Sequence, residues 1–141
     1  FPLMTESGTF AVPVIFYQPG GTLKGHIDAI AQQIDIMPTV LGYLGYDKPY
    51  ISFGCDLLAT PTSQTSAVNY IGGVYQYHKG RYLLQFDGKE SVALYDFVSD
   101  RLLEHNLLGT LPEIQSSMES ELKAIIQQYM TRMNTDKLVC E

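Results

Sequence analysis

Hydrophobic and polar positions change their spacing along the chain, and each change predicts a different element. Residues 10–17 form a short apolar run that ends at a Pro-Gly-Gly turn, which predicts a buried strand. Residues 22–33 show no clear period. The next apolar stretch has helical spacing and predicts a helix over about residues 36–44.

Asp35 and Gly45 bracket this predicted helix. Asp35 precedes its first turn and can cap it, Pro38 fits the first turn, and Gly45 can end it. A polar connection rich in Pro, Ser, Thr and Gly follows at residues 47–66. We therefore expect two parts, residues 1–58 and residues 59–141.

Strand-like spacing dominates the middle of the chain. Three apolar and aromatic runs predict an antiparallel meander: residues 67–78, 82–86 and 92–97. Asp87-Gly88 has the composition of a tight hairpin turn, whereas Gly72-Gly73 is expected to be a turn or a bulge.

The last element is predicted to be a long amphipathic helix. Thr110 and Glu113 have the spacing of a capping box, in which each side chain bonds to a free backbone N–H. Apolar residues then recur at helical spacing, at Ile114, Met118, Leu122, Ile125, Tyr129 and Met133. We expect this helix to cover one face of the sheet.

Composition narrows the classes of function. The chain has 141 residues, of which 45% are hydrophobic, so it can bury one core. Its formal net charge of −6 and its nine scattered Lys and Arg residues argue against nucleic-acid binding. No apolar run is long enough to span a bilayer, and the first residues lack the pattern of a signal peptide, so we expect any export signal to lie upstream.

Cysteine and histidine give little support for local chemistry. Cys55 and Cys140 either pair or both remain thiols, and neither belongs to a zinc-binding cluster. The three histidines lack a neighbouring nucleophile motif, so no catalytic triad is predicted. His26 is the candidate for contact with a phosphate or sulfate group, and His78 is expected to be solvated at a turn.

Four segments in order carry a family resemblance: Val14-Ile15-Phe16-Tyr17, residues 35–45, Phe53-Gly54-Cys55-Asp56-Leu57-Leu58, and residues 94–107. This order resembles the C-terminal part of sulfatase-family proteins in the alkaline phosphatase superfamily. The Phe-Gly-x-Asp-Leu-Leu pattern is most similar to the lipoteichoic acid synthase-like branch, which includes phosphoglycerol transferases. The motif positions are Asp35, Pro38, Thr39, Gly45, Gly54, Asp56, Tyr95, Asp96 and Asn106.

The resemblance implies an α+β fragment of an α/β alkaline-phosphatase-like fold. Residues 10–17 and 36–44 would be the last strand and helix of the main sheet, followed by the small antiparallel sheet and its helix. The intact enzyme would be bacterial and extracytoplasmic or periplasmic, and it would be anchored through an upstream segment.

The chemistry implied by the resemblance lies upstream of this chain. Such enzymes use a Thr, Ser or formylglycine nucleophile with a divalent metal, and the nucleophile and an Asp-His metal pair both precede the matched region. No catalytic or metal residue is therefore expected here, and the chain alone should be inactive and prone to self-association. The alternative is a free-standing binding or assembly module that uses the aromatic sheet to meet a glycan or a protein.

Overall fold

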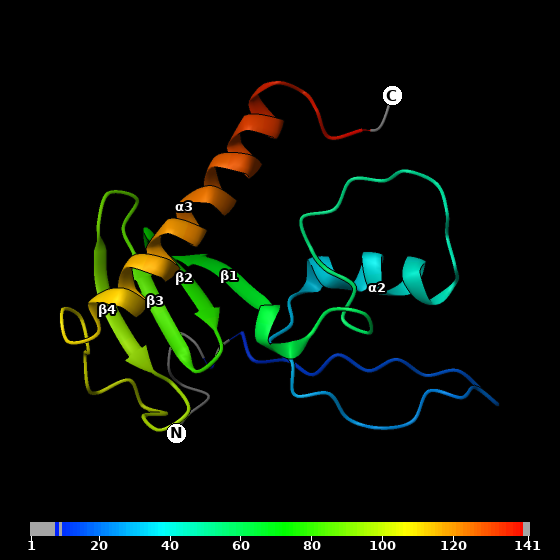
Figure 1. The fold of residues 1–141 in the computed structure, drawn as a ribbon, viewed down its shortest axis with the longest axis horizontal. Coiled ribbons are helices and arrows are strands. Elements are labelled where there is room, and N and C mark those ends of the chain that lie inside the picture. The colour runs from blue at the N-terminus through cyan, green and yellow to red at the C-terminus, as the bar shows by residue number, and fades with distance from the viewer. Residues whose placement is uncertain (1–7, 9, 140–141) are drawn as a thin grey trace.

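The computed structural model describes residue 8 and residues 10–139, and this part of the chain has an α+β fold. Helix α3 (Pro112–Asn134) crosses one face of a four-stranded antiparallel sheet, and helix α2 (Ile36–Tyr43) lies beside the sheet (Figure 1). Two short 3-10 helices, η2 (Gln33–Asp35) and η3 (Thr62–Gln64), precede α2 and the first strand of the sheet, respectively. The small antiparallel sheet, the short helix and the long C-terminal helix confirm the predicted order of elements.

The strands follow one another in the order β1-β2-β3-β4. Their bounds are β1 (Ser66–Ile71), β2 (Val74–Lys79), β3 (Tyr82–Phe86) and β4 (Ser91–Asp96). The turn or bulge expected at Gly72-Gly73 is confirmed as a turn between β1 and β2, so the prediction of one strand over residues 67–78 was wrong. The φ angles of the two glycines, 60° and 86°, belong to the left-handed region that a two-residue hairpin requires. The hairpin predicted at Asp87-Gly88 is confirmed between β3 and β4.

The core lies between the sheet and the first half of α3. It consists of Tyr77, Leu84, Phe86 and Leu94 from the strands and Met118 and Leu122 from the helix. This packing confirms that the helix covers one sheet face. Tyr129 and Met133, farther along the apolar stripe, are exposed because the second half of α3 extends past the sheet (Figure 1).

Helix α3 begins one residue later than the predicted capping box requires. Its N-cap is Leu111, and the hydroxyl of Thr110 donates to the carbonyl of Leu107 at 2.6 Å instead of capping the helix. Proline disfavours helical geometry in the residue before it, and Leu111, with φ −127° and ψ 67°, is non-helical. The capping-box prediction for Thr110 and Glu113 was therefore wrong.

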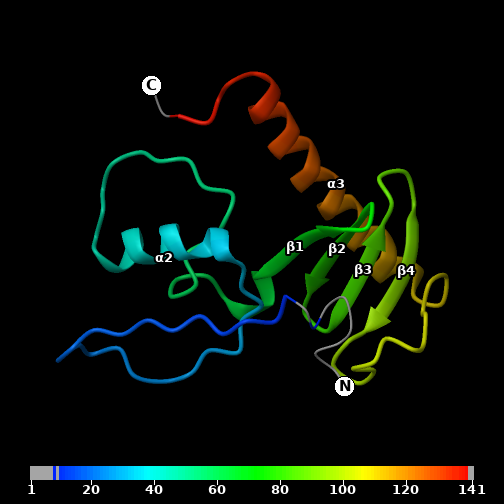
Figure 2. The same cartoon turned by 180° about the vertical axis from the view of Figure 1, so that it is seen from behind.

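Residues 10–17, which we call the arm, do not form the predicted strand. Figures 1 and 2 show the arm running away from the sheet, after which the chain turns and returns alongside it. A strand needs a neighbour to accept and donate its backbone hydrogen bonds, and no described segment pairs with the arm. Its side chains are consequently exposed, with Ile15 at 81% and Tyr17 at 85%.

Candidate functional site

Several of the residues that carry the resemblance meet at a junction between α2 and residues 52–58. Asp35 is 1% exposed, and its carboxylate accepts hydrogen bonds from the backbone N–H groups of Gln32 and Cys55, both at 2.8 Å. Asp35 occupies the N-cap position of α2, but its side chain does not bond to that helix. The predicted cap is wrong because Asp35 ends η2 in a helical conformation, whereas a capping side chain needs an extended one.

Thr39 supplies the second connection of the junction. Its buried hydroxyl donates to the carbonyl of Asp35 at 2.6 Å and accepts from the N–H of Leu57 at 2.9 Å. The Thr39 hydroxyl thus holds the loop to the first turn of α2, because it donates one hydrogen bond and accepts another. Residues 52–58 cannot shift along the helix without breaking these bonds.

Two glycines allow the junction to close. A Cβ atom on Gly54 would collide with the carbonyl oxygen of Ile34, and one on Gly42 would collide with the carboxylate of Asp56. Asp56 in turn accepts a hydrogen bond from the N–H of Leu58 at 2.9 Å. The Gly and Asp of the Phe-Gly-x-Asp-Leu-Leu pattern therefore have packing roles, since only glycine fits against the Ile34 backbone.

The end of α2 agrees with the sequence prediction. Gly45 has a φ angle of 66°, its N–H donates to Gly42, and the N–H of Tyr46 donates to Leu41, both at 3.0 Å. These two bonds form a Schellman motif, which satisfies the last carbonyls of the helix. Pro38 lies buried in the first turn, as predicted.

The remaining motif residues close the opposite edge of the sheet. Asn106 accepts hydrogen bonds through its side-chain oxygen from the N–H groups of Leu94 and Leu108, at 3.1 and 2.9 Å. An amide side chain thereby occupies the position of a neighbouring strand and protects β4 from pairing with another chain. Asp96 pairs with Arg81 at 2.6 Å, and this hydrogen bond lowers the pKa of its carboxyl to about 2, while Tyr95 is half-buried in β4.

His26, the predicted substrate contact, lies on the irregular segment after the arm. Its side chain is 81% exposed and bonds to the Asp28 carboxylate at 2.7 Å. The structure does not place it at the junction. Contact between His26 and a phosphate or sulfate group stays a prediction.

His78 is not the solvated turn residue that the sequence predicted. It lies within β2 opposite Leu83, is 8% exposed, and packs edge-on against the ring of Phe97 with 5.4 Å between ring centroids. The turn comes two residues later because Gly80, with a φ of 58°, supplies the left-handed position. Burial disfavours the charged imidazolium and lowers the pKa of His78 to about 4.

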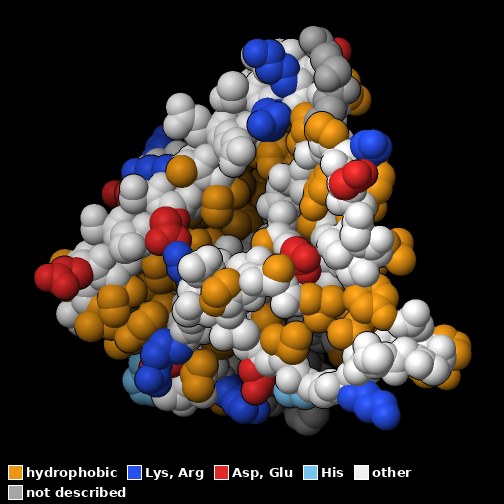
Figure 3. All heavy atoms as spheres, turned by 45° about the vertical axis from the view of Figure 1, so that its right-hand side comes forward, with side chains coloured by type: hydrophobic (Ala, Val, Ile, Leu, Met, Phe, Trp, Pro, Cys, Tyr) orange, Lys and Arg blue, Asp and Glu red, His pale blue; other side chains and the backbone are white. Residues whose placement is uncertain are grey.

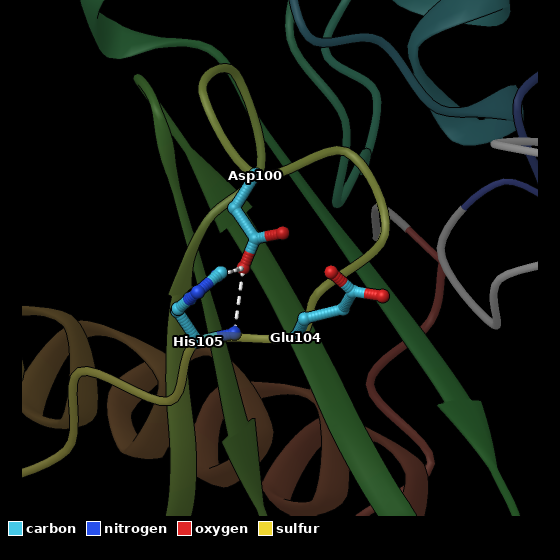
Figure 4. A group of neighbouring side chains, drawn as sticks. All are labelled: Asp100, Glu104 and His105. Atoms are coloured by element: carbon cyan, nitrogen blue, oxygen red, sulfur yellow. Dashed lines mark hydrogen bonds and ion pairs between the residues drawn. The ribbon is translucent and has the colours of Figure 1, made fainter.

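One described group of side chains has ligand atoms close enough to suggest a cation site. Asp100, Glu104 and His105 place these atoms within 4.8 Å of one another (Figure 4). The Asp100 carboxylate, however, accepts from the backbone N–H of His105 at 2.8 Å and lies 3.4 Å from Nδ1 of the same residue. These contacts close the loop between the two residues, and Glu104 and His105 are exposed, so we assign the group no metal.

An exposed apolar surface adjoins the junction and consists of the arm and the outer side of α2. The helix contributes Ile36, Met37, Val40, Tyr43 and Leu44 to it. Figure 3, which brings this side of the molecule forward, shows exposed hydrophobic side chains in several groups. The Tyr43 hydroxyl bonds to the Gln18 side chain and so connects α2 to the turn that ends the arm.

Cys55 is the one cysteine among the described residues, and Cys140 lies outside them. The Cys55 thiol is half-buried next to Asp35, and burial together with that carboxylate raises its pKa. A raised pKa keeps the thiol protonated and poorly nucleophilic. Pairing of the two cysteines stays a prediction.

Comparisons with known proteins add no assignment to this geometry. No helix in the described part of the chain is both long and apolar enough to cross a bilayer. No protein-family model matches the chain, and no curated protein matches it.

Proposed function

We propose that the chain is the C-terminal portion of a metal-dependent sulfuric-ester hydrolase or phosphoglycerol transferase of the bacterial envelope. It would complete an alkaline-phosphatase-like core and form one wall of the substrate cleft. The nucleophile and the divalent metal would lie in the missing N-terminal region. That enzyme would be extracytoplasmic or periplasmic and would be anchored to the membrane through an upstream segment.

The exposed arm is the observation that carries this proposal. Its sequence has the composition of a buried strand, yet Ile15 and Tyr17 are exposed and its backbone pairs with no described segment. Leu44, at the end of the neighbouring helix, is 71% exposed. Apolar surface costs about 25 cal/mol per Å² to leave in water, so an exposed apolar arm and helix of this kind favour a further layer of protein.

The junction supports the same assignment. Asp35, Thr39, Gly54 and Asp56 are spread over residues 35–56 but meet in one packed arrangement. The junction also fixes residues 52–58 beside α2, where the preceding loop is available as a cleft wall.

The metal in such an enzyme activates the nucleophile and neutralises charge on the sulfuryl or phosphoryl oxygens. The grouping of Asp100, Glu104 and His105 does not provide the Asp-His pair that the resemblance implies, and its carboxylate at Asp100 is already bonded within the loop. We therefore derive no catalytic step from these residues. Their role in the proposal is to hold the chain that follows β4.

The alternative of a free-standing module has less support from the sheet. The rings of Tyr77 and Phe86 are buried beneath α3 and cannot meet a glycan or a protein without displacing that helix. Tyr70 of β1 remains exposed and packs against Tyr75, with 4.6 Å between the ring centroids. One exposed ring is a small platform for recognition.

A direct test assays the purified chain with nitrophenyl sulfate and nitrophenyl phosphate, with and without added manganese or magnesium. The proposal expects no saturable turnover of either ester, because the nucleophile is absent. Metal-dependent turnover that co-purifies with the folded chain would overturn it. A parallel assay in which the metals are removed by a chelator identifies any contaminating phosphatase.

A further inference from the structure

A cavity lies on the face of the sheet that α3 does not cover. Its volume is about 800 Å³, within the range of small-molecule sites. Its lining includes Phe10 and Val12 of the arm, Ala67 of β1, and Phe97 and Leu103 of the loop after β4. These walls are mainly apolar, so an apolar ligand body would gain from entering the cavity.

The lining of this cavity carries positive charge, whereas the protein as a whole carries net negative charge. The chain has a formal net charge of −6, but no described residue that lines the cavity is acidic. Arg101 lines it, and no described residue forms an ion pair with this guanidinium. The neighbouring Asp100 carboxylate is bonded to His105.

The other polar side chains in the lining, which include His78 and Asn69, affect which ligands the cavity would accept. His78 is buried in its wall, and its low pKa keeps the ring neutral near pH 7. Asn69 lines the same cavity from β1 and adds an uncharged amide. The wall thus offers one permanent cation and neutral hydrogen-bonding groups, a combination that suits a single anionic group.

We propose that this cavity binds a small amphipathic organic anion, with its aromatic or aliphatic body between the arm and the sheet and its carboxylate or sulfonate on Arg101. The proposal does not depend on the enzyme assignment. It predicts a ligand-binding function for the part of the sheet that the α3 core leaves open.

Two dyes of matched shape test it. Anilinonaphthalene sulfonate carries the negative group, and phenylnaphthylamine has the same aromatic body without it. Arg101→Gln should weaken binding of the sulfonate about tenfold and leave binding of the neutral dye unchanged, as expected for loss of one charge-assisted contact. Arg132→Gln is the matched control, because Arg132 lies on α3 and does not line the cavity. Arg101 is exposed, so its replacement should not prevent folding, and circular dichroism checks this.

Backbone amide NMR locates the dyes. The proposal expects the sulfonate to shift the amide signals of Ala67, Asn69 and His78 more than those of α2. Absence of binding, shifts confined to α2 and the distal arm, or equal weakening by Arg101→Gln and Arg132→Gln would each overturn it. This readout is independent of catalysis, so its failure leaves the proposed enzyme fragment untouched.

Discussion

The carboxylate of Asp35 accepts a hydrogen bond at 2.8 Å from the backbone N–H of Cys55, which lies 20 positions farther along the chain. This one contact fixes the loop before the sheet against the start of α2. The same carboxylate holds Gln32, whose side-chain oxygen accepts from the N–H of Val68 in β1 at 3.1 Å. A continuous set of bonds therefore runs from the loop through Asp35 to the edge of the sheet.

Removing the Asp35 carboxylate should destabilise the whole fold. Asp35→Ala leaves two backbone N–H groups without their acceptor at a position that is 1% exposed, and we expect a loss of about 2–4 kcal/mol in the free energy of unfolding. Urea denaturation followed by circular dichroism measures it. Asp47→Ala is the control, since Asp47 is exposed, and it should change stability by less than about 0.5 kcal/mol. Equal effects of the two variants would refute a structural role for Asp35.

The two junction glycines should differ in their tolerance of alanine. Gly54→Ala places a Cβ against the backbone of Ile34, which cannot turn aside, and should cost about 2 kcal/mol or more. Gly42→Ala meets only the carboxylate of Asp56, which can rotate, and gains about 1 kcal/mol of helix propensity. Thermal unfolding of both variants should rank Gly54→Ala as clearly less stable. The reverse order would contradict the packing described for the junction.

His78 should make the protein less stable in acid. Its pKa falls from the ordinary 6.5 to about 4 on folding because burial disfavours the imidazolium. The unfolded chain therefore binds the proton more readily, so the stabilisation is complete above pH 6.5 and is lost as the pH falls from 6.5 to about 4. The shift corresponds to at most about 3 kcal/mol.

The difference between two pH profiles isolates this effect. Free energies of unfolding are measured for the parent chain and for His78→Gln from pH 7.5 to 4. The two values should converge as the pH falls, because only the parent chain loses the contribution of this one titrating group. A profile for His78→Gln that runs parallel to the parent throughout would show that His78 is not buried as a neutral ring.

The exposed arm and α2 should make the chain self-associate. Light scattering at increasing protein concentration is expected to show a rising mean mass, because apolar side chains of these segments lack a covering layer. Ile15→Ser together with Leu44→Ser should reduce the association, whereas Val139→Ser, which is also exposed but follows α3, should not. A monomer at all concentrations, or equal relief by Val139→Ser, would count against this surface.

Local patterns in the sequence predicted most of the elements, and the errors have physical causes. The helical spacing of Met118 and Leu122 predicted the face of α3 that is buried, because this period depends only on neighbouring residues. Pro112 moved the helix start away from Thr110, a steric effect that the capping pattern alone does not include. Gly72-Gly73 divided one apolar run into two strands because both glycines have positive φ angles and form a turn.

The site was harder to predict because its contacts join distant positions. The bond from Asp35 to Cys55 and the burial of His78 depend on tertiary packing, which no short window of sequence contains. The composition of the arm is typical of a strand, but a strand forms only where a partner strand is present. The cavity with Arg101 could not have been found from the sequence, since its walls come from five separate stretches of chain.

The most direct test of the central claim is to read the DNA upstream of the Phe1 codon and translate it in frame. The account predicts membrane helices followed by a Thr nucleophile and an Asp-His metal pair, or a Cys/Ser-x-Pro-x-Arg motif if the enzyme is a sulfatase proper. A start codon or a signal peptide immediately before Phe1 would contradict the account and leave a complete non-catalytic module.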